Sequence, residues 1–177
     1  MHFESELLPN VWHISLPRFQ DKRGILVKTF SQSVYQKHGI NINWREEFYS
    51  FSNKDVVRGM HFQTPPADHF KLIYCASGSV IDVLLDLRKG PGYGKVAHVK
   101  LESDKPSVIV MPPGIAHGFR SLVDHSLMVY KTSTEYSMDQ DAGIHWDSFS
   151  FDWGLDHPIT SDRDAGHISF LDFVSPF

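Results

Sequence analysis

The sequence predicts an all-β protein, an antiparallel jelly roll or barrel with a few short helices. Three observations support this fold class. Short segments with strand-like composition follow one another closely over most of the chain, and many alternate apolar and polar residues, as half-buried strands do. Gly, Pro, Asn and Asp separate these segments where turns would fall. Helical periodicity is sparse, so a closed or sandwiched antiparallel sheet is favoured.

The elements can be assigned in chain order. One helix is expected over 31–39, with Ser31 as its N-cap and Gly39 as its C-terminal stop. Turns are expected at 77–78, 89–92 and 104–106. The pattern shows no internal repeat or linker, which indicates a single domain over residues 1–177. Strands are expected over residues 11–16, 24–30, 47–53, 56–62, 70–77, 79–88, 95–101, 107–112 and 126–133.

The bulk composition excludes several classes of protein. A chain of 177 residues with 41% hydrophobic and 21% charged residues is an ordinary globular protein with a sizeable core. A net charge of −4 argues against a nucleic-acid or membrane-surface binder. No apolar run reaches membrane-spanning length, and MHFESELLPN lacks the features of a signal peptide, so we expect a cytoplasmic protein. The one cysteine, Cys75, lies in an apolar segment and is expected to be a small buried residue.

Two segments carry the chemistry, RGMHFQ at 58–63 and MPPGIAHGF at 111–119. They resemble the two sequence motifs of a cupin barrel whose metal ligands have been altered. The second histidine of the usual His-x-His is Gln63, and Lys71 takes the place of the carboxylate. An ammonium carries donors and no acceptor, so it opposes a divalent cation. The segments therefore predict acid–base chemistry in a barrel rather than metal chemistry.

More of the chain resembles one family, the nucleotide-sugar epimerases typified by dTDP-4-dehydrorhamnose 3,5-epimerase. The resemblance implies a cupin-type jelly roll that works as a homodimer without metal or organic cofactor. It also implies a nucleotide-diphosphate 4-keto-6-deoxy sugar as substrate, in deoxysugar biosynthesis for surface polysaccharide or glycosylated metabolites. The segments that carry it are DKRG at 21–24, VVRGMHFQ at 56–63, KLIYCASGSVIDVLLDLRKGPGYG at 71–94, MPPGIAHGF, VYK around Tyr130, GIHWDS at 143–148 and SDRD at 161–164.

Epimerisation beside a ketone needs a base on one face, an electrophile for the enolate oxygen and an acid on the other face. The resemblance implies His61 as the base, with Asp164 fixing its tautomer. It implies Lys71 as the cation beside the ketone oxygen and Tyr130 as the acid. Among the substrate-binding residues that the resemblance implies, Gln63, His117 and Asp82 are expected in the same pocket.

The resemblance also implies a site for the nucleotide. Arg23 and Arg58 match the family's diphosphate-binding arginines, and Tyr136 matches the aromatic residue on which the base stacks. Three further positions, Lys28, Glu46 and Phe48, depart from the residues with which the thymidine enzymes read the base. An ionised glutamate only accepts hydrogen bonds, which suits an amino group such as cytosine N4. These positions suggest a non-thymidine nucleotide, with CDP as the candidate.

Several alternatives stay open. The chain can be a single-carbon epimerase, acting at C3 or C5 of a CDP-linked or other nucleotide-linked 4-keto sugar, a sugar-nucleotide ketoisomerase, a metal cupin, or a catalytically inactive sugar-nucleotide-binding cupin. Tyr130 can be a core residue, Lys71 a solvated strand end and Asp164 a helix cap. Six further histidines are expected to be structural: His13, His98, His125, His145, His157 and His167. The apolar C-terminal FLDFVSPF is expected to pack on the barrel or on a partner chain.

Overall fold

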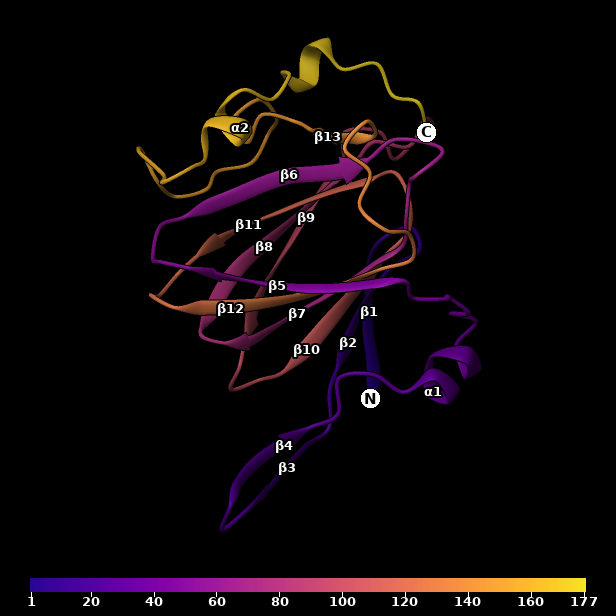
Figure 1. Ribbon diagram of the computed structural model, residues 1–177, viewed down its shortest axis with the longest axis vertical. Coiled ribbons are helices and arrows are strands. Elements are labelled where there is room, and N and C mark those ends of the chain that lie inside the picture. Colours follow the sequence, from indigo (N-terminus) through magenta and orange to yellow (C-terminus); the bar gives the residue numbers. More distant parts are fainter.

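The computed structural model describes residues 1–177 as two antiparallel sheets packed face to face (Figure 1). The prediction of an all-β jelly roll with few helices is confirmed. The six-stranded sheet has the order β1 (His2–Leu8), β2 (Val11–Ser15), β10 (Ser107–Met111), β7 (Lys71–Ser77), β12 (Ser126–Thr132) and β5 (Glu46–Ser52). The five-stranded sheet has the order β13 (Asp141–Gly143), β6 (Val57–Gln63), β11 (Ile115–Ser121), β8 (Ser79–Asp86) and β9 (Val96–Glu102).

The main core lies between the two sheets, and a period of two selects the side chains that enter it. On β8, Val80 and Leu84 point inward and are fully buried, whereas Val83 and Leu85 pack on the outer face of the same strand. Asp82 lies between Val80 and Leu84 in this alternation, so its carboxyl group also enters the core, where it is fully buried. The same alternation on other strands brings polar side chains to one end of the core.

The outer faces of both sheets are covered by less regular chain. The segment around α1 (Gln32–Lys37) packs the buried Tyr35 against the six-stranded sheet. The C-terminal segment, with α2 (Asp162–Ala165) and η1 (Phe170–Asp172), runs over the five-stranded sheet (Figure 1). Its residues Phe170, Phe173 and Phe177 pack against that sheet, which confirms the expected packing of the C-terminus on the barrel.

A two-stranded hairpin of β3 (Arg18–Asp21) and β4 (Gly24–Val27) projects away from the sheets (Figure 1). Its tip is the DKRG segment, where Gly24 adopts a φ of +122° that favours glycine. The hairpin exposes large apolar side chains, because Phe19 is 58% and Leu26 is 60% exposed. An isolated two-stranded hairpin with an apolar surface buries little of that surface within its own chain.

The structure differs from the sequence prediction at some elements. The predicted helix is confirmed as α1, although the Ser31 side chain makes no capping hydrogen bond. The strand expected over 24–30 ends at Val27, and the one expected over 79–88 ends at Asp86. Strands β1, β3, β11 and β13 were not predicted. The glycines and prolines of MPPGIAHGF are typical of a loop, and they hide β11 because pairing on both of its edges overrides local propensity.

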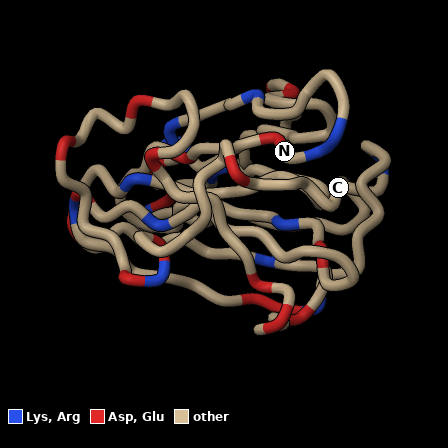
Figure 2. Tube along the Cα trace, turned by 90° about the horizontal axis from the view of Figure 1, so that it is seen from above, with Lys and Arg blue, Asp and Glu red and all other residues tan.

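The charged residues do not gather on one side of the molecule. Figure 2 shows Lys and Arg interspersed with Asp and Glu around the chain, in keeping with the net charge of −4. No helix in the structure is long and apolar enough to cross a membrane. Cys75 is buried, and burial raises the pKa of its thiol to about 11, so it is the unreactive core residue that the sequence predicts.

Candidate active site

One pocket of about 440 Å³ opens between the two sheets, a volume typical of a small-molecule site. Inward-facing side chains of β5, β6, β7, β11 and β12 form most of its wall, and α2 and the segment around β13 close one side. The residues that line it are Glu46, Phe48, Ser50, Arg58, His61, Phe62, Gln63, His69, Lys71, His117, Phe119, Tyr130, Thr132, Tyr136, Asp141 and Arg163.

Strand alternation explains why residues far apart in sequence meet here. On β6, Met60 and Phe62 pack on the outer face, so His61 points to the inner face of the five-stranded sheet. On β12, Met128 and Tyr130 point to the inner face of the opposite sheet. His61 and Tyr130 therefore stand on facing walls of the pocket.

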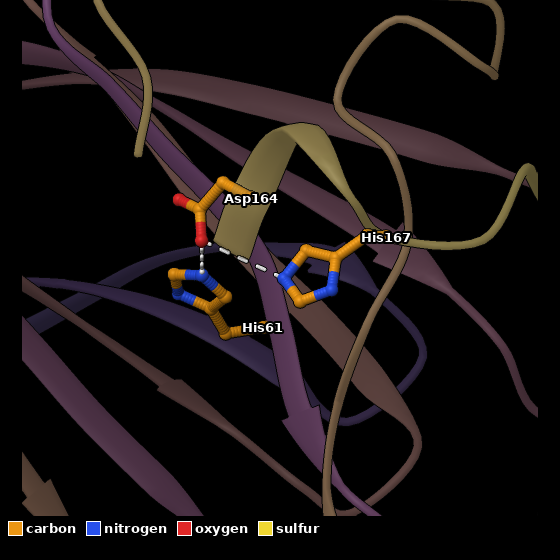
Figure 3. A group of neighbouring side chains, drawn as sticks. All are labelled: His61, Asp164 and His167. Atoms are coloured by element: carbon orange, nitrogen blue, oxygen red, sulfur yellow. Dashed lines mark hydrogen bonds and ion pairs between the residues drawn. The ribbon is translucent and has the colours of Figure 1, made fainter. Parts of the chain in front are cut away.

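The His61 imidazole is held by a carboxylate from the C-terminal segment (Figure 3). Its Nε2 lies 2.8 Å from Asp164 Oδ1, and the Gly59 N–H donates to Asp164 Oδ2 at 3.1 Å. The Ser161 hydroxyl caps α2 by accepting the Asp164 N–H, so Asp164 itself lies inside this short helix and is not its cap. A carboxylate can only accept here, so His61 Nε2 carries the proton and Nδ1 keeps its lone pair.

Burial and the surrounding hydrogen-bond donors together set the charge of this pair. Burial lowers the pKa of His61, an effect only partly opposed by Asp164, so the imidazole is neutral at neutral pH. Burial alone would raise the pKa of Asp164, but the nearby His167 and His61 imidazoles and the Gly59 N–H lower it well below its ordinary value. The pair is thus a neutral imidazole oriented by an ionised carboxylate. A group of this kind can accept a proton at Nδ1.

Lys71 opens β7 and points into the pocket, where it is only 8% exposed. Burial lowers the pKa of its ammonium to about 8, although Asp82 and Asp141 favour the charged form. The Nζ donates to the His61 carbonyl oxygen at 3.4 Å, a long hydrogen bond. Because no carboxylate contacts it closely, the ammonium has donors available for an oxygen in the pocket. A solvated strand end is excluded by its burial.

Tyr130 lies on the opposite wall and is 7% exposed. Its hydroxyl is 2.9 Å from the Ser50 hydroxyl, and its ring stacks on Phe48 with centroids 4.8 Å apart. Burial raises the pKa of Tyr130, so it is protonated at neutral pH. The residue packs against the core and also presents a hydroxyl to the pocket.

A second histidine–carboxylate pair lies deeper in the barrel. His117 on β11 is opposite His61 in the strand register, and its Nε2 is 2.7 Å from Asp82 Oδ2. Asp82 is fully buried, which raises its pKa, and its Oδ1 has no hydrogen-bond partner. Asp82 does not reach the pocket surface, whereas His117 does.

The expected nucleotide-binding residues are only partly brought together. Arg58, Gln63, Tyr136, Glu46 and Phe48 all line the pocket. Gln63 is also engaged by its own chain, since its amide nitrogen donates to the Ala67 carbonyl and its oxygen accepts the Ser137 N–H.

Arg23 and Lys28 do not line the pocket. Arg23 lies at the tip of the projecting hairpin, where its side chain is 83% exposed and pairs with Asp21. Lys28 directly follows β4 and is exposed. Neither residue therefore contributes to the pocket of its own chain, because the hairpin points away from the sheets (Figure 1).

Sequence reasoning missed several pocket residues. Strand alternation would have found Ser50 and Thr132, which lie two residues from Phe48 and Tyr130. Burial lowers the pKa of His69 to about 3, so this residue is uncharged in the wall. Asp141 and Arg163 pair with each other at 2.5 Å at the edge of the pocket. Nothing in the local sequence indicates that these last two meet.

One group of side chains has the composition of a metal site. Potential ligand atoms of His61, Asp164 and His167 lie within 4.8 Å of one another. The group differs from the cupin ligand set, because Asp164 and His167 come from the C-terminal segment and not from the barrel strands. The hydrogen bond from His61 to Asp164 accounts for the close approach of that pair without an ion.

The fold and the pocket define a cupin-type protein whose site carries acid and base groups on facing walls. A family model for dTDP-4-dehydrorhamnose 3,5-epimerase matches residues 5–172. The dTDP-4-dehydrorhamnose 3,5-epimerase of Shigella flexneri is 36% identical over 169 residues, which are 93% of this chain and 93% of that protein. The chain therefore belongs to the dTDP-4-dehydrorhamnose 3,5-epimerase family, a family of isomerases.

Solved structures agree with this assignment. The crystal structure of dTDP-4-dehydrorhamnose 3,5-epimerase from Sulfolobus tokodaii has a TM-score of 0.91 and 33% identity, covering 99% of this chain and 99% of that one. A Legionella pneumophila dTDP-6-deoxy-D-glucose-3,5-epimerase in complex with dTDP-4-keto-L-rhamnose has a TM-score of 0.92 and 26% identity. That match covers 98% of this chain and 94% of the other.

Proposed function

We propose that the protein epimerises dTDP-4-dehydro-6-deoxyglucose at C3 and C5, through an enolate, in deoxysugar biosynthesis. The observation that carries the proposal is the placement of a carboxylate-held His61 and a protonated Tyr130 on facing walls of one pocket. Both C3 and C5 neighbour the C4 ketone, so one site for the enolate oxygen serves both carbons. An inactive binding module would have no need of this acid and base.

In the proposed mechanism, His61 Nδ1 removes the α-proton, and Asp164 stabilises the imidazolium that forms. The electron pair of the C–H bond forms the C=C bond of the enolate as the C=O π pair moves onto the ketone oxygen, where the Lys71 ammonium stabilises the negative charge. Tyr130 then donates its proton to the opposite face of the carbon. The tyrosinate keeps its hydrogen bond from Ser50 until exchange with solvent restores both groups. We assign the buried His117–Asp82 pair a supporting role in shaping the pocket floor.

The proposal is tested by incubating the enzyme with dTDP-4-dehydro-6-deoxyglucose and recording proton NMR coupling constants of the sugar ring. Inversion at both C3 and C5 is expected. Inversion at a single carbon would establish the single-carbon alternative. A sugar recovered without inversion would contradict the proposed activity.

A second candidate substrate is the CDP-linked 4-keto sugar, because Glu46 lines the pocket at a base-reading position. An ionised glutamate accepts a hydrogen bond from an amino group, which cytosine has and thymine lacks. Of the other two departures, Phe48 lines the pocket and Lys28 lies outside the pocket of its own chain. Matched dTDP and CDP substrates compared by kcat/KM decide between them, and a clear thymidine preference contradicts the CDP alternative.

We propose further that the enzyme is a homodimer in which the β3–β4 hairpin reaches the partner's pocket. The exposed Phe19 and Leu26 on the hairpin support this, as does the exposed Arg23 guanidinium at its tip. Arg58 would then bind the diphosphate from its own chain and Arg23 from the partner, each as a planar fork of donors. Tyr136 is left to stack on the base.

Arg23→Ala is expected to raise KM by about 10- to 100-fold, the effect of losing a charged hydrogen bond to phosphate, with kcat little changed. Mixed dimers of Arg23→Ala and His61→Ala subunits show whether Arg23 serves the pocket of its own chain or the pocket of the partner. If Arg23 serves the partner's pocket, one pocket in the mixed dimer has both groups, so activity is regained on mixing. No recovery on mixing, with dimers still formed, contradicts the arrangement.

Tyr130→Phe is expected to abolish inversion while leaving proton removal in place, because His61 is untouched. In deuterated water, the variant should exchange the α-proton of the substrate from His61's face and return the original configuration. The readout is deuterium content by NMR alongside ring stereochemistry. Inversion at the wild-type rate would show that Tyr130 is not the acid.

The pH dependence follows from the two shifted groups. Lys71 is charged below its pKa of about 8, so kcat/KM should fall as pH rises through this value. His61 has a pKa below its ordinary 6.5, so kcat/KM should fall again only in acid solution. Lys71→Arg keeps its charge at alkaline pH, so the kcat/KM of this variant should not fall as pH rises through about 8. An alkaline limb near pH 8 that survives in this variant contradicts the assignment.

A further inference from the structure

His167 lies beside the His61–Asp164 pair, but the mechanism proposed above does not use it (Figure 3). It follows α2, and its side chain is 11% exposed. Its Nε2 is buried without a hydrogen-bond partner, and Asp164 Oδ1 stands 3.5 Å away, close enough for an ion pair but long for a hydrogen bond. That oxygen is the one that His61 contacts. A buried polar atom without a partner is costly, so its position calls for an explanation.

The backbone opposite the ring leaves room for it. A Cβ at Gly143 would lie only 2.3 Å from His167 Nε2, so a residue with a side chain at 143 would displace the imidazole. Gly143 on β13 pairs with His61 on β6, which places the His167 ring over the register position of the base. The two imidazole rings meet edge to face with centroids 5.6 Å apart.

The chain on both sides of His167 is fixed by hydrogen bonds. The His145 N–H donates to the Ile168 carbonyl at 2.8 Å, which joins this segment to the chain that follows β13. On the other side, Asp164 is tied to the barrel through Gly59. Hydrogen bonds on both sides of His167 therefore fix the chain that places its side chain against Asp164.

We propose that His167 is a positioning residue for the His61–Asp164 pair. A carboxylate oxygen only accepts hydrogen bonds, so His167 presents Nε2–H to Asp164 Oδ1. The carboxylate then has donors from His61, His167 and Gly59, which hold it ionised and in one orientation. His61 is kept in the tautomer whose Nδ1 is free to act as the base. Proton removal from the substrate makes His61 cationic, and Asp164 must then remain an acceptor. The contact between His167 Nε2 and Asp164 Oδ1 shortens at this point. This inference rests on the proposed function of the site.

The test compares two replacements of similar size. His167→Gln can keep an N–H donor near the Nε2 position, whereas His167→Leu removes it. His167→Leu is expected to lower kcat by about 10- to 100-fold, the usual effect of losing a group that orients an active residue, with KM within about twofold of wild type. His167→Gln is expected to recover most of the activity. Wild-type kcat in His167→Leu, or equal loss in both variants, overturns the proposal.

Two further readouts separate positioning from general damage. In an Asp164→Ala background, His167→Leu should cause little further loss, because the residue acts through Asp164. A full and independent loss in that background contradicts the proposal.

Nitrogen-15 NMR of the free protein should show His61 mainly protonated at Nε2 in wild type and a mixture of tautomers in His167→Leu. An unchanged His61 spectrum in the variant overturns the inference. This readout needs no turnover, so it tests the His167 contact independently of the activity assay. Absence of epimerase activity in wild type would refute the proposed function without refuting the contact.

Discussion

Replacing His61 by Ala is expected to lower kcat for epimerisation by about 10³-fold, within the range for loss of a general base. The imidazole is held at 2.8 Å by Asp164 and faces the pocket from the wall opposite Tyr130. Substrate binding should persist, because Arg58 and Tyr136 are untouched. Turnover assays with a titration of the substrate separate the two effects.

His157→Ala is the matched control for this loss, since His157 is an exposed histidine that does not line the pocket. Its kcat and KM should equal those of wild type. Epimerisation by His61→Ala at more than a tenth of the wild-type rate would show that another group removes the proton.

Lys71→Met is expected to lower kcat by about 10²- to 10³-fold, the usual effect of losing a donor to a developing oxyanion. The same change should raise the stability of the fold. A lysine whose pKa falls to about 8 on folding is a buried cation that opposes folding below this pH, and the opposition fades as pH rises towards the ordinary value of 10.5. Met carries no charge to bury, so we expect the free energy of unfolding to rise by an amount on the order of 1–3 kcal/mol at neutral pH.

A fall in kcat together with a rise in melting temperature is therefore the signature of Lys71. Lys105→Met serves as the control, because the Lys105 side chain is 86% exposed and does not line the pocket. It should change neither quantity appreciably. Lys71→Met with wild-type turnover would remove Lys71 from the mechanism, and a lowered melting temperature would contradict the burial argument.

Much of the barrel can be predicted from local pattern. The alternation along the segment that became β12 reports which face is buried, and that face carries Tyr130, whereas β7 and β8, which carry Lys71 and Asp82, are buried on both faces. Strand β11 was not predicted because the Pro112-Pro113-Gly114 segment directly before it and its own Gly118 are typical of a turn, while its pairing with β6 and β8 is a property of the assembled sheet. Local preferences do not encode such pairing.

The site was predictable where the residues lie on strands and less so elsewhere. His61, Lys71, Tyr130 and Asp164 come together as the sequence predicts, although the roles given to them remain proposals. Arg23 was assigned to the pocket by its motif, but the direction of a hairpin depends on contacts beyond its own sequence. His167 was expected to be structural, because its approach to Asp164 depends on how the C-terminal segment crosses β6.

Deuterium incorporation tests the central claim most directly. The purified enzyme is incubated with dTDP-4-dehydro-6-deoxyglucose in deuterated water, with the CDP sugar in parallel, and proton NMR follows the signals at C3 and C5. Both signals of the dTDP sugar should disappear with wild type and persist with His61→Ala. Persistence of both signals with wild-type enzyme would contradict enolisation of this substrate in the pocket.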